Sequence, residues 1–223
     1  MEGAFINPVW VTGLKDESSF VERSCRRVIM NASKAKRSSM LKEKVLVSLK
    51  GLEKGYGSVV VTDDQDDIID DLVCDLEDEN PEPSAEDSSF MVGRWKLLFT
   101  SSSLTRFQKG ISGIHSLLPV GKSMDLEQVI EPEDFRSYLV EKVSYFGGAL
   151  KGDALIDGRY KWLSSNRLSW MPDVLNLWFL RFQAESGWKA LGAFRSLEVT
   201  YLDYELKIER GEVGQIYIWK RIE

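Results

Sequence analysis

The spacing of hydrophobic residues along the chain changes near residue 90. Before that point, apolar residues recur three or four positions apart, as one face of a helix requires. The first such stripe consists of Leu41, Val45, Leu49 and Leu52. It ends before the turn-forming segment Gly55–Gly57, which predicts one short amphipathic helix.

A second helix is predicted to begin at Asp63 or Asp64. Either aspartate suits an N-cap, and further acidic residues follow in the first turn. The apolar stripe of this helix consists of Ile68, Ile69, Leu72, Val73 and Leu76. Pro81 ends the helix because the residue before a proline is pushed out of helical geometry. Glu82–Ser89 then forms a linker.

From Phe90 onward the apolar residues alternate with polar ones, as half-buried strands require. In the first predicted strand, Trp95, Leu97 and Phe99 share one face. The other predicted strands are Met124–Ile130, Ser137–Phe146, Ala154–Leu163, Asn166–Trp170, Leu177–Gln183, Leu197–Leu202, Tyr204–Glu209 and Gln215–Lys220. Many short strands with few helices between them predict a mainly β fold, an antiparallel barrel or sandwich preceded by two short α-helices.

Charge is distributed unevenly, although the formal net charge is only −6. Thirteen acidic residues and no Lys or Arg lie between Asp63 and Asp87, so the rest of the chain is mildly basic. A basic body can bind anionic lipid headgroups, but an ordinary solvated surface is the simpler interpretation.

Residues 1–32 have features of an organellar transit peptide. Arg23, Arg26 and Arg27 precede the apolar-to-alanine end of the segment Cys25–Ala32, as near the cleavage region of organellar targeting peptides. Four acidic residues before Arg23 depart from that pattern. No uncharged apolar run approaches the roughly 20 residues that a membrane-spanning helix needs.

The usual signatures of catalysis and metal binding are missing from the sequence. Cys25 and Cys74 are far apart and form no CxxC motif, and His115 is the only histidine. No serine lies in a GxSxG motif, and Gly121-Lys122-Ser123 lacks the earlier glycine of a phosphate-binding loop. We therefore predict no cofactor, no metal site and no enzyme activity.

Three stretches together resemble the plastid-lipid-associated protein family, also called fibrillins. They are Leu72–Pro83, Gly93–Ser102 and Thr200–Gly211. The second contains the Gly-x-Trp sequence, Gly93 and Trp95 here, that is shared with lipocalin-like barrels. The resemblance covers about residues 38–221.

This resemblance implies a lipocalin-like β-barrel over residues 90–223, preceded by a helical segment and acidic linker over residues 33–89. It also implies a plastid location, at plastoglobules, thylakoids or in the stroma. The implied partners are lipids or small apolar isoprenoids at a peripheral membrane or lipid-droplet surface, and no nucleic acid. The implied function is binding or coating lipids without catalysis.

Five residues are candidates for ligand contact within such a barrel. Trp95, Phe99 and Trp178 are candidate interior contacts. Asp203 and Arg210 flank the last hairpin and are candidates for an ion pair near the barrel mouth. A purely structural clamp at this hairpin is an equally good interpretation of Asp203 and Arg210.

Two other classes of function stay open at this point. The second hypothesis is a structural coat or scaffold, whose barrel is filled by its own side chains and docks on a lipid droplet or a partner protein. The third hypothesis is an enzyme acting on a lipid head or lactone ring, with His115 or Asp203 as the base.

Overall fold

The computed structural model describes residues 17–50, 63–102, 105, 111–112, 121–132, 135–177, 180–183 and 189–223. The chain forms two compact units, Met1–Arg37 and Ser38–Glu223. The second unit contains the sheet and both hydrophobic cores. The predictions that concern Trp178, His115 and Gly55–Gly57 fall outside the described residues.

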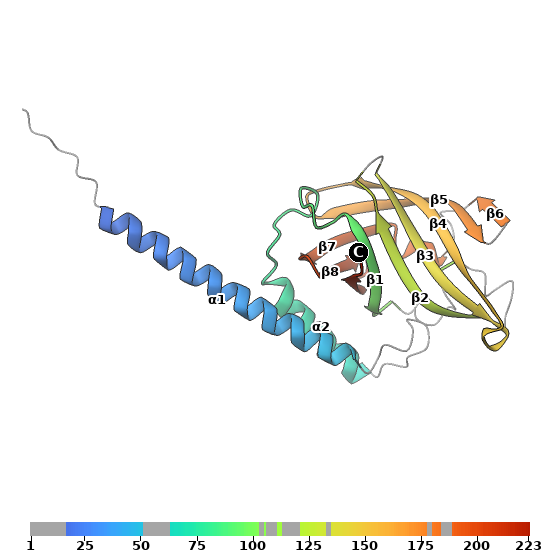
Figure 1. The fold of residues 1–223 in the computed structure, drawn as a ribbon, viewed down its shortest axis with the longest axis horizontal. Coiled ribbons are helices and arrows are strands. Elements are labelled where there is room, and N and C mark those ends of the chain that lie inside the picture. Colours follow the sequence, from blue (N-terminus) through green and yellow to red (C-terminus); the bar gives the residue numbers. More distant parts are fainter. Residues whose placement is uncertain are drawn as a thin grey trace, which may run out of the picture. The chain divides into compact units, whose positions relative to one another are not determined.

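Nine antiparallel strands form one sheet that closes on itself. The strands are β1 (Gly93–Thr100), β2 (Gly121–Ile130), β3 (Arg136–Tyr145), β4 (Leu150–Trp162), β5 (Arg167–Leu177), β6 (Leu180–Gln183), β7 (Ser196–Leu202), β8 (Leu206–Gly211) and β9 (Ile216–Arg221). Their order is β4-β3-β2-β1-β9-β8-β7-β5-β6, and an additional pairing between β4 and β5 completes the ring (Figure 1). The predicted fold class, mainly β with N-terminal helices, is confirmed.

Two long helices precede the ring, α1 (Glu17–Leu49) and α2 (Asp63–Glu77). α2 begins where predicted, but α1 begins much earlier than the short helix that we expected around Leu41. No Gly or Pro interrupts the sequence between Glu17 and Leu49, so nothing stops the helix within that range. Among the described residues, no helix is long and apolar enough to cross a membrane.

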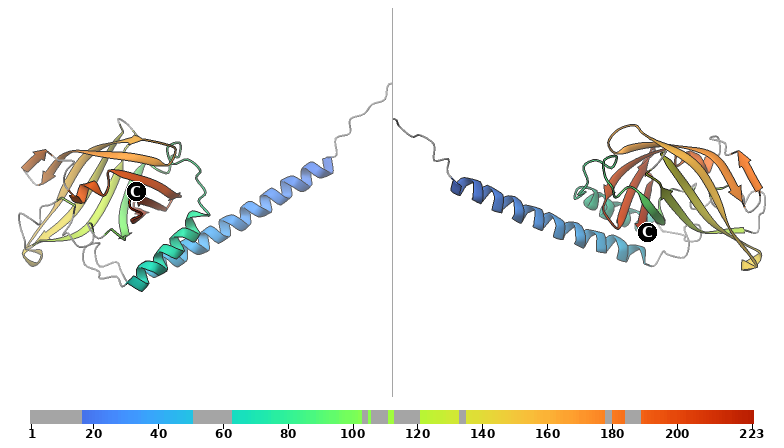
Figure 2. Two further views of the ribbon diagram at one scale, coloured as in Figure 1. Left: turned by 180° about the vertical axis from the view of Figure 1, so that it is seen from behind. Right: turned by 45° about the horizontal axis from the view of Figure 1, so that its top comes forward.

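Two hydrophobic cores lie on opposite sides of the ring wall. The first fills the inside of the ring and includes Trp95, Trp170 and Trp219. The second lies outside, where the C-terminal part of α1 and the length of α2 cover the outer face of β1, β7, β8 and β9 (Figure 2). The helices contribute Leu41, Val45, Leu49, Ile69, Val73 and Leu76, which occupy the predicted apolar stripes.

A bulge in β1 corrects one prediction about which residues share a face. The pairing of β1 with β9 shifts register between Leu97 and Phe99, so Leu98 is an extra residue. Because one extra residue reverses the inside-outside alternation, Trp95 and Leu97 point into the ring and Phe99 does not. Phe99 instead belongs to the outer core beneath the helices.

β5 is longer than predicted, because its pattern continues past Pro172. Proline lacks a donor for strand pairing and is tolerated where the pairing is irregular. Pro172 lies opposite Gly158, next to a register shift between Asp157 and Gly158. This local irregularity lets one strand run from Arg167 to Leu177.

The ring has two ends, which we call the linker rim and the far rim. The linker rim is where β1 begins, and the linker after α2 attaches there: the Ala85 amide donates to Asn166 Oδ1 at 2.8 Å, and the Glu86 amide donates to the Ser165 carbonyl at 2.9 Å. The far rim is where β1 ends, and it includes the β3–β4 turn and the start of β6.

Candidate functional site

A polar cluster lies inside the ring, built around a completely buried lysine. Lys207 on β8 lies opposite Trp219 on β9 in the sheet register. Its ammonium is 5.4 Å from the ring centroid of Trp219 and 5.4 Å from that of Trp95. All three side chains have an exposed fraction of 0%. Aromatic faces stabilise such a cation, and the stabilisation increases when water is excluded.

Lys207 has two polar partners within this cluster. Its ammonium donates to Glu209 Oε1 at 2.9 Å and also to Gln128 Oε1. Burial lowers the pKa of Lys207, while the neighbouring Glu209 carboxylate opposes that shift. The cluster is therefore a fully buried ion pair whose charge is balanced within the ring.

Two polar atoms at the same level have no hydrogen-bond partner among the described residues. They are Glu209 Oε2 and Trp219 Nε1. Glu209 Oε2 is an acceptor and Trp219 Nε1 is a donor. A buried polar atom without a partner costs free energy, so a molecule that paired with either atom would remove part of that cost.

A second buried carboxylate lies nearer the far rim. Glu141 on β3 is completely buried, accepts a hydrogen bond from the Ser112 amide at 2.8 Å, and accepts another from the Ser123 hydroxyl. Burial and the charge of Glu141 together raise the pKa of Tyr145 to about 12. The interior is thus mainly apolar, with two separate buried polar groups.

Arg221 closes the linker rim. Its guanidinium carbon is 4.3 Å from the ring centroid of Trp95. The same guanidinium donates to the carbonyls of Val92 at 2.8 Å and Tyr204 at 2.7 Å, and to that of Phe90. Burial lowers the pKa of Arg221. These bonds join the linker, the β7–β8 turn and the last strand at one point.

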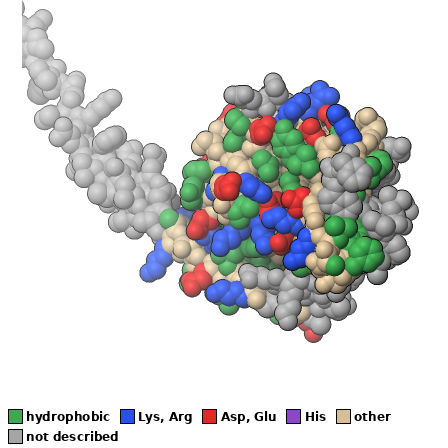
Figure 3. Space-filling model, turned by 45° about the vertical axis from the view of Figure 1, so that its right-hand side comes forward, with side chains coloured by type: hydrophobic (Ala, Val, Ile, Leu, Met, Phe, Trp, Pro, Cys, Tyr) green, Lys and Arg blue, Asp and Glu red, His purple; other side chains and the backbone are tan. Residues whose placement is uncertain are grey.

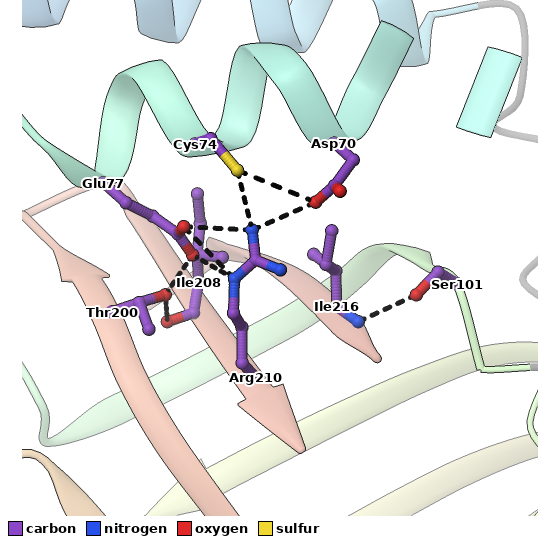
Figure 4. Close-up of polar contacts among 8 residues, drawn as sticks. All are labelled: Asp70, Cys74, Glu77, Ser101, Thr200, Ile208, Arg210 and Ile216. Carbon is purple, nitrogen blue, oxygen red and sulfur yellow. Dashed lines mark hydrogen bonds and ion pairs between the residues drawn. The ribbon is translucent and has the colours of Figure 1, made fainter. Parts of the chain in front are cut away.

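Arg210 fastens α2 to the outside of the ring (Figure 4). Its guanidinium makes a bidentate contact with Glu77, with Nε 2.8 Å from Oε1 and Nη2 3.0 Å from Oε2. Nη2 also lies 3.0 Å from Asp70 Oδ1 and 3.3 Å from Cys74 Sγ. The Glu77 and Asp70 carboxylates raise the pKa of Arg210 further above its ordinary value.

Asp203 fastens α1 in a similar way. Its Oδ1 accepts hydrogen bonds from the amides of Glu205 and Leu206, each at 2.7 Å. Its Oδ2 accepts from Lys42 at 3.0 Å and from the Tyr201 hydroxyl at 2.8 Å. Burial alone would raise the pKa of Asp203, but these donors hold it below its usual value.

The comparison with known protein families adds what the geometry alone does not give. The model of the PAP_fibrillin family matches residues 39–156, more than half of the chain. The chain belongs to the PAP/fibrillin family. This family is plastid-associated and consists of structural, lipid-associated proteins. No curated protein and no solved structure matched the chain.

The fibrillin match begins in α1 and ends within β4, so it includes α2, the linker, the first three strands and the first half of β4. Lys207, Glu209 and Arg210 lie beyond its end. In the described part of this fibrillin, no group of three or more His, Cys, Asp or Glu residues is arranged to hold a metal ion.

The structure separates the four described candidate residues, Trp95, Phe99, Asp203 and Arg210, instead of gathering them. Trp95 lies in the ring beside Lys207, whereas Phe99 lies in the outer core. Trp178 falls outside the described residues. Asp203 and Arg210 do not pair with each other, because each binds a different helix of the fibrillin chain. Asp203 holds α1 against the ring, and Arg210 holds α2.

Sequence reasoning missed the buried Lys207 and Glu209. Their strand shows clean alternation, in which Leu206 and Ile208 form the apolar face. In this fibrillin the helices cover that apolar face, while the ring encloses the charged one, so both faces are buried. The one available signal was opposite charge at positions 207 and 209, which share a face of the strand.

Proposed function

We propose that this protein coats or binds lipid surfaces inside plastids, at plastoglobules or thylakoids, without catalysing a reaction. The observation that carries this proposal is the filled layer inside the ring. Trp95, Lys207 and Trp219 are each 0% exposed, so a lipid tail would have to displace them to pass that level. Contact with a lipid surface from outside requires no such rearrangement.

The environment of Asp203 argues against the enzyme hypothesis for that residue. A general base needs a free lone pair directed at its substrate. Asp203 already accepts four hydrogen bonds, two from backbone amides and two from side chains. The other candidate base, His115, lies outside the described residues, and activity assays of a His115→Ala variant test it directly.

A small apolar ligand inside the ring is the second candidate function. It is supported by the unpartnered atoms Glu209 Oε2 and Trp219 Nε1. A ligand that carries a hydroxyl group on an isoprenoid body would offer a hydrogen-bond partner to these atoms. Such a ligand would quench tryptophan fluorescence, because Trp95 and Trp219 line the same layer.

Mass spectrometry of the small molecules that co-purify with the protein from plastids tests the proposal. We expect plastid lipids or isoprenoids in excess over a mock purification from the same extract. An extract that is indistinguishable from the mock purification contradicts lipid binding. Titration of delipidated protein with the recovered compounds then separates the two candidates, because only an internal ligand strongly quenches the buried tryptophans.

A further inference from the structure

We propose that the far rim of the ring is the surface that contacts lipid, through apolar side chains on the β3–β4 hairpin and on β6 and through basic side chains beside them. This inference rests on the proposed function and assigns it to particular residues. The contact surface consists of Phe146, Leu150, Lys151, Leu180, Arg181 and Phe182, which we call the far-rim patch.

The β3–β4 hairpin projects beyond its neighbour on the sheet. Ala154 of β4 pairs with the last residue of β5, Leu177, so residues 150–153 extend past the end of that strand. At the tip, Phe146 is 60% exposed and Leu150 is 41% exposed. Gly147 and Gly148 both adopt positive φ and shape the turn between them. Large apolar groups thus stand at the outermost point of the hairpin.

At the far rim, β6 extends the apolar inner face of β5 with side chains that are exposed. Leu180 lies opposite Leu177, and Phe182 lies opposite Leu175. Leu175 and Leu177 are buried in the inner core, whereas Leu180 and Phe182 are each 41% exposed. The hairpin tip and β6 lie at the same end of the ring in every view of Figures 1 and 2.

Charge distinguishes the far rim from the linker rim. The linker-rim connections, residues 78–92, 131–135, 203–205 and 222–223, contain acidic residues and no Lys or Arg. In contrast, the described residues of the far-rim connections, 101–102, 105, 111–112 and 146–149, contain no Asp or Glu. Lys151 and Arg181 flank the exposed apolar residues there, and the acidic exceptions are Asp153 in β4 and Glu212 in the β8–β9 turn.

The wall of the ring between the two rims contributes little net charge. On the outer face of β1, β2 and β3, Glu127 pairs with Arg94 at 2.6 Å and with Lys142 at 2.5 Å. Lys96 pairs with Asp125 at 2.9 Å on the same face. Figure 3 shows basic and acidic side chains intermixed on the face in view. Exposed basic side chains at the strand ends of the linker rim, Arg136, Arg159, Lys161 and Arg167, partly offset its acidic connections. An anionic surface therefore favours the far rim over the linker rim.

Together, exposed apolar groups and adjacent basic groups fit a lipid surface with anionic headgroups. Apolar side chains at such a surface are transferred out of water, and basic side chains interact with the headgroups. The linker rim also exposes apolar residues, Phe135, Leu163 and Tyr204, but the connections beside Phe135 and Tyr204 carry acidic side chains and no Lys or Arg. Substitutions at the linker rim therefore serve as controls for substitutions at the far rim.

Flotation of the full chain with vesicles tests the assignment. The vesicles contain phosphatidylcholine, either alone or mixed with phosphatidylglycerol. Phe146→Asn and Phe135→Asn form a matched pair, since their φ angles are 50° and 51° and their exposed fractions are 60% and 59%. Asparagine tolerates this left-handed conformation, so both variants keep the turn. Lys151→Glu and Lys161→Glu form the matched charge pair.

We expect Phe146→Asn to lower partitioning onto the mixed vesicles about tenfold. Lys151→Glu should lower it at least about fivefold. Phe135→Asn and Lys161→Glu should leave partitioning near the wild-type value. Equal losses at the two rims, or no loss in any variant, would overturn the far-rim assignment while leaving lipid association intact.

A wild-type chain that floats with neither kind of vesicle would contradict the proposed function itself. If such a chain nevertheless retained a plastid protein, and Phe146→Asn abolished that retention, the far rim would be a protein interface and the lipid inference would be wrong. Thermal unfolding midpoints of all four variants establish that each remains folded.

Discussion

The ammonium of Lys207 lies 2.9 Å from Glu209 Oε1, and both side chains are completely buried inside the ring. Burying two charges is costly, and their attraction offsets that cost only while both are present. The ion pair therefore constrains which substitutions the interior tolerates. It also occupies a level that an internal lipid tail could pass only by displacing it.

Removing one member of this pair should destabilise the protein strongly. Lys207→Met leaves the Glu209 carboxylate buried without its partner, and we expect the free energy of unfolding to fall by about 3–5 kcal/mol. The double variant Lys207→Met, Glu209→Leu should recover the wild-type value or exceed it. Urea unfolding of the three proteins measures this, and a double variant no more stable than the single one would contradict the account.

Loss of the Arg210 contacts should lower the free energy of unfolding more than loss of an exposed ion pair. Arg210→Ala removes a bidentate contact between β8 and α2 and should lower the free energy of unfolding by about 1.5–3 kcal/mol. Arg159→Ala is the control, because its partner Asp173 is also exposed and such pairs contribute less than about 1 kcal/mol. Equal effects of the two substitutions in urea unfolding would show that Arg210 does not hold the helix.

Acid should weaken the Asp203 clamp. The pKa of Asp203 is lowered in the folded protein, so its stabilising contribution is complete above the unfolded-state pKa of about 3.9. That contribution is lost as the pH falls through the lower, folded-state value. At pH 7 we expect Asp203→Asn to be less stable than the wild type by about 1–2 kcal/mol.

The pH dependence of this difference is the diagnostic measurement. Urea unfolding between pH 7 and about pH 2 should show the wild-type advantage shrinking below about pH 4, as Asp203 becomes protonated. A difference that stays constant down to the lowest pH would mean that the charge of Asp203 does not act through Lys42.

Gly158 should resist substitution because its surroundings leave no space for a side chain. A Cβ at this position would lie 2.6 Å from the Met171 carbonyl oxygen and 2.7 Å from the Trp170 ring. Gly158→Ala should therefore cost about 1–3 kcal/mol through overpacking. Gly192→Ala is the matched control, since a Cβ there meets nothing within 4 Å. Thermal unfolding midpoints that shift equally in both variants would contradict this packing.

Much of the architecture was predictable because its patterns are local. The stripe through Leu41, Val45 and Leu49 specifies a helix face, and alternation specifies most of the strands. The face of Phe99 was not predictable, because the bulge at Leu98 depends on pairing with β9, which lies far away in the sequence. Local alternation carries no information about where such an extra residue occurs.

The candidate site was less predictable than the fold. Arg210 and Asp203 were identified as a possible clamp, but their partners Glu77 and Lys42 lie more than a hundred residues earlier in the chain. Lys207 and Glu209 resembled the solvated face of a strand. Only the three-dimensional arrangement, with helices outside and a closed ring inside, shows that both faces are buried.

Flotation of the purified full chain with vesicles made from extracted plastid lipids tests the central claim, lipid association, most directly. We expect the protein to rise with the vesicles through a density gradient, and to do so less completely as salt screens the basic groups. Protein that stays at the bottom of the gradient at every salt concentration would contradict the account.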